Sequence, residues 1–353
     1  MATTLFDKFK LNPENIESIK DAVSYTTYHD EDFESFVRIM KVKNNDPVAF
    51  IGDMDMVGKK GGGCDPVYEE KGIASDLKRW TLGDWQIPIK MCYESVKGTV
   101  AEYALKTGTM IGDMQDTDIM AIYTDALGKA IKQMIWRYGW FGDTAAQHVS
   151  DGGKITNEID IDHFTVCDGL FKRIFEICTN KASQLTAISA NKKTSASEQK
   201  SAMLEKGYAT NLIDTLLMDV DSRILDDSSA VLMMTRSFAD ALTNDVRKTY
   251  QINMPWEKIF DGFDTTTYQG VKIARVSIWD RMIAANEKGE STVNLPYRAV
   301  FANPKQLMVG TDSDSLISSL DIWFERKERR NYIYAQGKIG THILEEDMIH
   351  AAY

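Results

Sequence analysis

A long amphipathic helix is the clearest element that the order of apolar and polar residues predicts. Across Asp116–Tyr138, apolar residues recur mostly every three or four positions, which is the spacing of one helix face. Three further apolar residues widen this stripe, so we expect burial over much of the circumference (Leu127, Ile131 and Ile135). Gly139 follows directly and is predicted to end the helix.

The chain before this helix begins with a stretch that predicts two short helices. Over Asn15–Met40, apolar residues fall at helix-like intervals on both sides of an acidic, turn-like segment, residues 29–32.

A long hairpin is predicted next. In residues 50–57 the apolar period changes to two, as in a strand, and the glycine-rich segment 58–63 follows. The chain then returns through residues 85–93, where alternate apolar side chains share one face. Pro88 cannot donate to a sheet ladder, so this second strand is predicted to be an edge strand or part of an extended arm.

Strand-like and helix-like stretches alternate over residues 203–312, which predicts an α/β unit. The polar segment 188–202 is expected to be a boundary or surface loop, and Thr235 and Ser237 are candidate helix caps. The expected order is a helix, a strand, a helix and three strands (212–224, 230–234, 238–247, 270–276, 298–303 and 306–309). Residues 320–334 and 338–344 return to a strand period of two.

The composition fits a globular protein made and kept in a cytoplasm. Of the 353 residues, 43% are hydrophobic, yet no apolar run is long enough for a membrane span and the first 20 residues resemble no secretory signal. The four cysteines are sparse, so reduced thiols are expected (Cys64, Cys92, Cys167 and Cys178). A formal net charge of −11 argues against a nucleic-acid-binding surface, so contact with DNA is expected to be confinement.

One cluster of residues could support metal chemistry. If residues 158–162 form a strand, the carboxylates of Glu158, Asp160 and Asp162 lie on one face, and oxygen-rich clusters can bind calcium or magnesium. The alternative, which we favour, is the solvated face of a strand whose isoleucines point inward.

Two other segments have simpler explanations than a binding site. The stretch Gly52–Lys60 has five residues between its glycines where a phosphate-binding loop needs four, so a hairpin tip is favoured. The basic cluster 326–330 contains a glutamate, which favours an exposed strand or a charged subunit contact. No catalytic, cofactor-binding or metal-binding residue is predicted.

The order of elements resembles the major capsid fold shared by tailed double-stranded-DNA bacteriophages, herpesviruses and encapsulins. Local stretches that resemble this family are 80–93 with 95–105, 131–143 with its terminal Gly142-Asp143, 231–242 and 268–273. The resemblance implies an α+β fold with five parts: an N-terminal arm (1–45), an extended hairpin loop (46–86), a peripheral domain with a spine helix (87–184 and 116–138), an axial α/β domain (185–318) and returning strands of the peripheral domain (319–353).

The resemblance also implies a function without enzymatic activity or a cofactor. The expected role is a major capsid subunit that self-assembles into hexamers and pentamers of an icosahedral or prolate shell around packaged double-stranded DNA. The expected partners are further copies of the chain, a separate scaffold protein, a portal and decoration proteins, with no membrane involved. The chain would lie in the virion, assembled in the cytoplasm of the host bacterium.

Several points stay open at this stage. An encapsulin-like compartment shell is an alternative function, and a metal-dependent enzyme using Glu158, Asp160 and Asp162 is a third. We expect neighbouring subunits to cover the apolar face that starts at Trp85. Lys59 and Lys60 lie in the loop where some relatives form cross-links, but no asparagine partner is identified and no cross-link is predicted.

Overall fold

The computed structural model describes residues 31–54, 60, 73–92, 116–259, 263–313, 319–325, 327–328 and 330–353. The first predicted arm helix, most of the glycine-rich segment and the stretch 95–105 lie outside these residues. The predictions for Lys59 and Cys64 also lie outside them.

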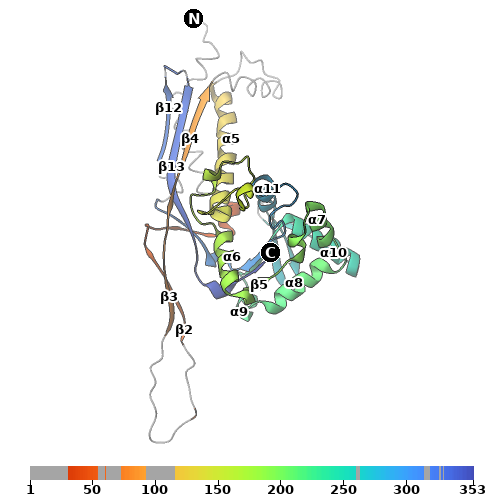
Figure 1. Ribbon diagram of the computed structural model, residues 1–353. Coiled ribbons are helices and arrows are strands. Elements are labelled where there is room, and N and C mark those ends of the chain that lie inside the picture. The colour runs from red at the N-terminus through yellow and green to blue at the C-terminus, as the bar shows by residue number, and fades with distance from the viewer. Residues whose placement is uncertain are drawn as a thin grey trace, which may run out of the picture.

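A long helix and a long, mostly antiparallel sheet form one side of the molecule (Figure 1). Helix α5 (Asp116–Trp136) confirms the predicted long helix. The central strand of the sheet is β13 (Arg330–Ile343), which pairs with β12 (Ser319–Glu325) on one side and β4 (Gly83–Cys92) on the other. Beyond β12, the same side of β13 pairs with β11 (Leu307–Thr311), which in turn pairs in parallel with β1 (Arg38–Lys41).

Side chains of the same chain bury the start of the apolar face of β4. Trp85 is only 4% exposed and belongs to one buried cluster with Ile131 and Ile135 of α5. The expectation that neighbouring subunits cover this face was therefore wrong for Trp85, because side chains of the same chain already bury it. Strand β4 pairs only with β13 among the described strands, which confirms the prediction that Pro88 lies in an edge strand.

The end of α5 differs from the prediction. The helix continues into a π-helical turn, η2 (Arg137–Phe141), which includes Gly139. A Cβ at Gly139 would lie 2.7 Å from the ring of Phe33, so close packing explains this glycine, and the helical stretch ends at Gly142 instead.

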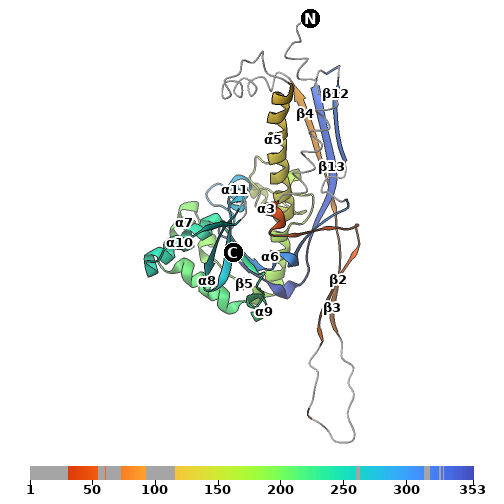
Figure 2. The same ribbon diagram turned by 180° about the vertical axis from the view of Figure 1, so that it is seen from behind.

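Strands β2 (Pro47–Met54) and β3 (Ile73–Arg79) form a separate two-stranded sheet. Both views show this hairpin pointing away from the rest of the molecule (Figures 1 and 2). The hairpin was predicted, but its return strand is β3 and not residues 85–93, which are in β4. Few apolar residues alternate in Ile73–Arg79, so the sequence carries little signal for this strand.

The second half of the chain forms an α/β unit around a seven-stranded sheet. The strand order is β5, β14, β10, β6, β9, β8 and β7 (Leu185–Thr186, Ile349–Ala352, Ala299–Ala302, Val231–Thr235, Val271–Val276, Phe263–Tyr268 and Glu257–Ile259). Alternate residues of β6 belong to two different buried clusters, so both faces of the sheet are covered. These strands confirm the predictions for residues 230–234, 270–276 and 298–303, and β11 confirms that for 306–309.

Helices cover the two faces of this sheet. One cluster contains side chains of α7, α8 and α10 (Ala196–Met203, Tyr208–Asp219 and Arg236–Tyr250). The other cluster contains side chains of α6 and α11 (Leu170–Asn180 and Ser277–Asn286) together with the end of α5. The described residues also contain shorter helices: α3, η3, η4, η5, η6, α9, η7 and η8 (Glu31–Glu34, Val149–Asp151, Ile161–His163, Ala182–Gln184, Ser189–Lys192, Ser222–Leu225, Pro304–Gln306 and Glu346–Met348).

Three local predictions were wrong. The second arm helix, expected to reach Met40, is only the four residues of α3, because the chain enters β1 at Arg38. The polar segment 188–202 contains η6 and most of α7, where the Ser195 side chain accepts a hydrogen bond from the Glu198 amide at 3.2 Å. The helix expected over 212–224 is interrupted at Val220, the C-cap of α8.

The cap of α10 comes from another helix. Thr235 occupies the N-cap position without a side-chain cap bond. Instead, the carboxylate of Asp280 in α11 accepts hydrogen bonds from the backbone amides of Arg236 and Ser237. Asp280 also accepts a hydrogen bond from the Ser237 hydroxyl. Of the two predicted cap residues, Thr235 therefore makes no cap bond, and Ser237 takes part only by binding Asp280.

Within the described ranges, no helix has the length and apolar character that a bilayer crossing requires.

Candidate functional site

The three carboxylates predicted as a possible metal site are not gathered. Residues 158–162 form a turn and the start of η4, not a strand, because Asp160 caps η4 and accepts the Asp162 amide at 3.0 Å. Within the described residues, no group of three His, Cys, Asp or Glu side chains could hold a metal ion. The alternative of a metal-dependent enzyme at Glu158, Asp160 and Asp162 therefore loses its structural basis.

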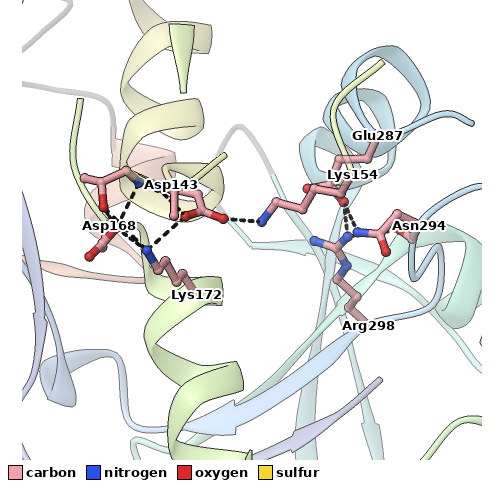
Figure 3. Close-up of polar contacts among 9 residues, drawn as sticks. Asp143, Lys154, Asp168, Lys172, Glu287, Asn294 and Arg298 are labelled. Carbon is pink, nitrogen blue, oxygen red and sulfur yellow. Dashed lines mark hydrogen bonds and ion pairs between the residues drawn. The ribbon is translucent and has the colours of Figure 1, made fainter. Parts of the chain in front are cut away.

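The structure instead gathers charged residues where α5 ends (Figure 3). Asp143 lies directly after the helical stretch, and its carboxylate is 2.9 Å from the Lys172 ammonium and 3.4 Å from that of Lys154. Lys172, in the first turn of α6, also contacts Asp168 at 2.8 Å. Asp168 lies four residues earlier, just before the helix. Asp168 in addition accepts hydrogen bonds from the backbone amide and the hydroxyl of Thr144. The network therefore connects the chain after α5, the segment around Lys154 and the start of α6.

The electrostatics of this network favour its charged forms. Burial would raise the pKa of Asp143, but hydrogen bonding and attraction from Lys172 and Lys154 outweigh it and lower that pKa. Burial likewise opposes ionisation of Asp168, whose pKa is lowered by Lys172 and Thr144. The two carboxylates outweigh burial at Lys172 and raise its pKa.

A second, fully buried ion pair lies in the neighbouring α/β unit (Figure 3). The side chains of Arg298 and Glu287 are 2% and 1% exposed and bond to each other. Arg298 also donates to the backbone oxygens of Leu295 and Asn294, while Glu287 accepts the Asn294 amide group at 2.9 Å. All these polar groups are satisfied locally, which is the condition under which a buried ion pair is tolerated.

Aromatic rings connect this ion pair to the helix-and-sheet side of the molecule. The Arg298 guanidinium lies over the rings of Phe171 and Phe175 in α6 and of Phe141 at the end of α5, at 4.9, 5.7 and 5.6 Å. Trp140 contacts Trp279 of α11, with ring centroids 4.6 Å apart. Paired charges and aromatic contacts thus join the long helix, α6 and the α/β unit into one body.

Sequence reasoning found only part of this region. The stretch ending in Gly142-Asp143 was singled out by resemblance, but Lys172, Glu287 and Arg298 were not. A basic residue directly before the wholly apolar strand Ala299–Ala302 was the one available signal for a buried cation.

The surface offers features suited to contacts with other chains. On the hairpin, Leu77 is 61% exposed. On the outer face of the long sheet, Trp323 is 44% exposed and stacks on Tyr332 with ring centroids 5.3 Å apart. The basic cluster 326–330 was expected to be an exposed strand or a charged subunit contact. Lys327 and Glu328 lie in the turn between β12 and β13, Arg330 begins β13, and residues 326 and 329 are not described.

The cysteine prediction is confirmed for two of the four residues. Cys167 and Cys178 are free thiols and buried, as expected for reduced cysteines. Burial raises the pKa of Cys167 to about 12 and that of Cys178 to about 11, so both are unreactive near neutral pH.

No protein-family model matches the chain, and no curated protein sequence matches it. Solved structures do match over most of its length. A structure from Mycobacterium phage Ogopogo has a TM-score of 0.50 at 14% identity and covers 91% of this chain and 90% of that one. The satellite phage P4 procapsid, with its size determination protein, gives 0.48 at 12% identity, covering 95% and 98%. The SrpI encapsulin complex of Synechococcus elongatus gives 0.47 at 8% identity, covering 92% and 88%.

At these identities the likeness concerns the fold alone. The long helix on its sheet, the projecting hairpin and the α/β unit follow the order that the resemblance implied. The chain has the α+β fold of phage major capsid proteins.

Proposed function

We propose that this chain is the major capsid subunit of a tailed bacteriophage, and that it self-assembles into hexamers and pentamers of an icosahedral or prolate shell around double-stranded DNA. The observation that carries the proposal is the hairpin β2–β3. It pairs with no other described strand and extends away from the body (Figure 2). A two-stranded ribbon is marginally stable alone in water, so a neighbouring copy is the partner that would complete it.

The rest of the molecule supports the same proposal. A shell subunit has to keep its shape while it repeats one contact around a ring. The buried pair of Arg298 and Glu287 and the network around Asp143 provide such a body, since they join the long helix to the α/β unit.

The finer parts of the proposal follow from the capsid fold. Residues 1–45, 46–86, 87–184, 185–318 and 319–353 would be the arm, the extended loop, the peripheral domain, the axial domain and the returning strands. The partners would be a separate scaffold protein, a portal and decoration proteins. Assembly would take place in the host cytoplasm, DNA would be held by confinement, and no enzymatic step is required.

Electron microscopy of the purified chain, with light scattering for mass, tests the proposal. The chain should be expressed alone and together with its neighbouring genes. Closed shells, or five- and six-membered rings, are the expected result. A folded monomer or dimer under every assembly condition would contradict the proposal.

An encapsulin-like compartment is the second candidate, because the fold matches shell proteins of encapsulins as well as those of phages. Its subunit would enclose a protein cargo instead of a genome. Shells purified from the native source distinguish the two functions: nuclease-protected DNA supports the phage capsid, and a co-purified enzyme without DNA supports the compartment.

A further inference from the structure

Three consecutive acidic residues lie where the long sheet passes into the α/β unit. Glu345, Glu346 and Asp347 follow β13 and precede β14, and the last two begin the short helix η8. Their carboxylates face cations from three separate elements. We call these three residues the acidic clamp.

The central residue of the acidic clamp holds the hairpin. One carboxylate oxygen of Glu346 is 2.7 Å from the Lys78 ammonium of β3, at the base of the hairpin. Its other oxygen is 3.4 Å from the Lys181 ammonium, just after α6. Lys181 also contacts Asp347 at 2.7 Å, so one carboxylate pair links the hairpin to α6.

The first residue of the acidic clamp reaches the α/β unit. The Arg223 guanidinium of α9 lies 3.1 Å from Glu345, and Asp221 orients the same guanidinium at 3.0 Å. The backbone oxygen of Glu346 accepts the Gln184 amide group at 2.9 Å, which fixes the position of the acidic stretch itself.

The other attachments that the described residues show lie at the base of the hairpin. Trp80, 3% exposed, packs with Val42 and Met308 directly after β3. From there the seven residues of β3 extend about 23 Å and pair only with β2 among the described strands. A contact at the base of the hairpin can therefore set the direction in which the whole hairpin points.

We propose that the acidic clamp sets the direction of the hairpin relative to the α/β unit, and that loss or screening of the pair between Lys78 and Glu346 releases it. A subunit could then present its hairpin at one angle when the pair is closed and at others when it is open. The inference concerns the single chain and holds whether or not the chain builds a shell.

Other charged groups near Glu346 determine how the clamp responds. The hollow beside Glu346 is also lined by Arg79, Arg173, Glu176 and His342. The hydrogen bond from Lys78, with attraction from Lys78 and Lys181, lowers the pKa of Glu346 against the effect of partial burial. The clamp is therefore closed near neutral pH, and screening by salt is the practical way to open it.

Distance measurements between two spin labels test the clamp. Leu77 and Met218 are 61% and 83% exposed, on the hairpin and on α8, so Leu77→Cys and Met218→Cys carry the labels. Cys64→Ser and Cys92→Ser remove competing thiols, while Cys167 and Cys178 are buried. Leu77 and Lys78 point to opposite sides of the strand, so the label does not displace the clamp.

The wild-type chain, as unassembled full-length subunits at low salt, should give one narrow distance distribution. Lys78→Gln should broaden it, with an open population increased by up to about fivefold, the range for a partly exposed ion pair. Glu346→Gln removes the other charge of the same ion pair and should broaden the distance distribution to a similar extent. About 1 M salt should broaden the wild-type distribution as well.

Two control variants separate the clamp from general damage. Lys78→Arg keeps the charge and should keep the narrow distribution. Lys272→Gln removes an exposed cation from β9 of the α/β unit, away from the hollow beside Glu346, and should leave the distribution narrow. Unchanged distributions in Lys78→Gln and Glu346→Gln, or equal broadening in Lys272→Gln, would overturn the inference.

Discussion

The seven-stranded sheet and the projecting hairpin are both built from strands, but they complete their contacts in different places. Every residue of β6, β10 and β14 is buried, and helices cover both faces of their sheet. The hairpin β2–β3 pairs only with itself in the described chain, and Leu77 is largely exposed. The sheet is therefore stable within one chain, whereas the hairpin is suited to a partner.

The largest predicted loss of stability concerns the buried ion pair in the α/β unit. Arg298→Ala leaves the Glu287 charge buried without its partner. We expect the free energy of unfolding, measured by urea denaturation, to fall by about 3–5 kcal/mol.

The matched control replaces both charges with neutral groups of similar size. Arg298→Met with Glu287→Gln should recover most of the lost stability, because no buried charge is left uncompensated. If Arg298→Ala were as stable as the wild type, the ion pair would not be required for the stability of the folded chain.

The next effect concerns the contact between residues before the hairpin and the long helix. Gly139→Ala places a methyl group 2.7 Å from the Phe33 ring. Overpacking of this kind should cost about 1–3 kcal/mol in thermal or urea unfolding. Phe33→Leu in the Gly139→Ala background should recover part of the loss, and no recovery would mean that the ring is not the obstacle.

A smaller loss is expected at the cap shared by two helices of the α/β unit. Asp280→Ala removes the acceptor for the first amides of α10, and caps contribute about 0.5–2 kcal/mol. Ser237→Ala keeps these backbone bonds and should cost less in the same unfolding measurement. The reverse order would assign the cap to Ser237.

A pH series isolates the ion network at the end of α5. The pKa of Asp168 is lowered in the folded chain, so its stabilisation is present above the ordinary aspartate value of 3.8 and is lost as the pH falls through the lower folded value. Asp168→Asn should therefore be less stable than the wild type at about pH 6, with a smaller difference at about pH 3. The exposed residue Asp226 offers the control variant Asp226→Asn, which removes one carboxylate outside this network. A difference between Asp168→Asn and the wild type that does not vary with pH would contradict this assignment.

The sequence correctly predicted those helices and strands whose apolar pattern is continuous along the chain. The helix Asp116–Trp136 and the strand Val231–Thr235 were found, because each has an uninterrupted helical or apolar pattern. Helix α7 was missed because it is polar, and its cap at Ser195 was a weak signal inside that segment. Strand β3 was missed because its few apolar residues hardly alternate.

The charged sites depended on residues far apart in the chain. Asp280 caps a helix that begins 44 positions earlier, and Lys78 pairs with Glu346 across 268 positions. Glu158, Asp160 and Asp162 show the opposite error: their alternation suggested a strand, but a local side-chain cap produced a turn and a short helix. Sequence spacing predicts neighbours within an element and cannot place two elements against each other.

The hairpin itself provides the most direct test of the central claim, that it serves a neighbouring copy. Val48 and Lys78 pair across its base, so an Asn-Gly turn can replace residues 49–77 and keep Lys78 with Glu346. Sedimentation velocity, with urea unfolding on the same samples, compares this variant with the full chain. We predict an unchanged free energy of unfolding, within about 0.5 kcal/mol, and a loss of shells and rings. Shells that form as efficiently without the hairpin would contradict the account.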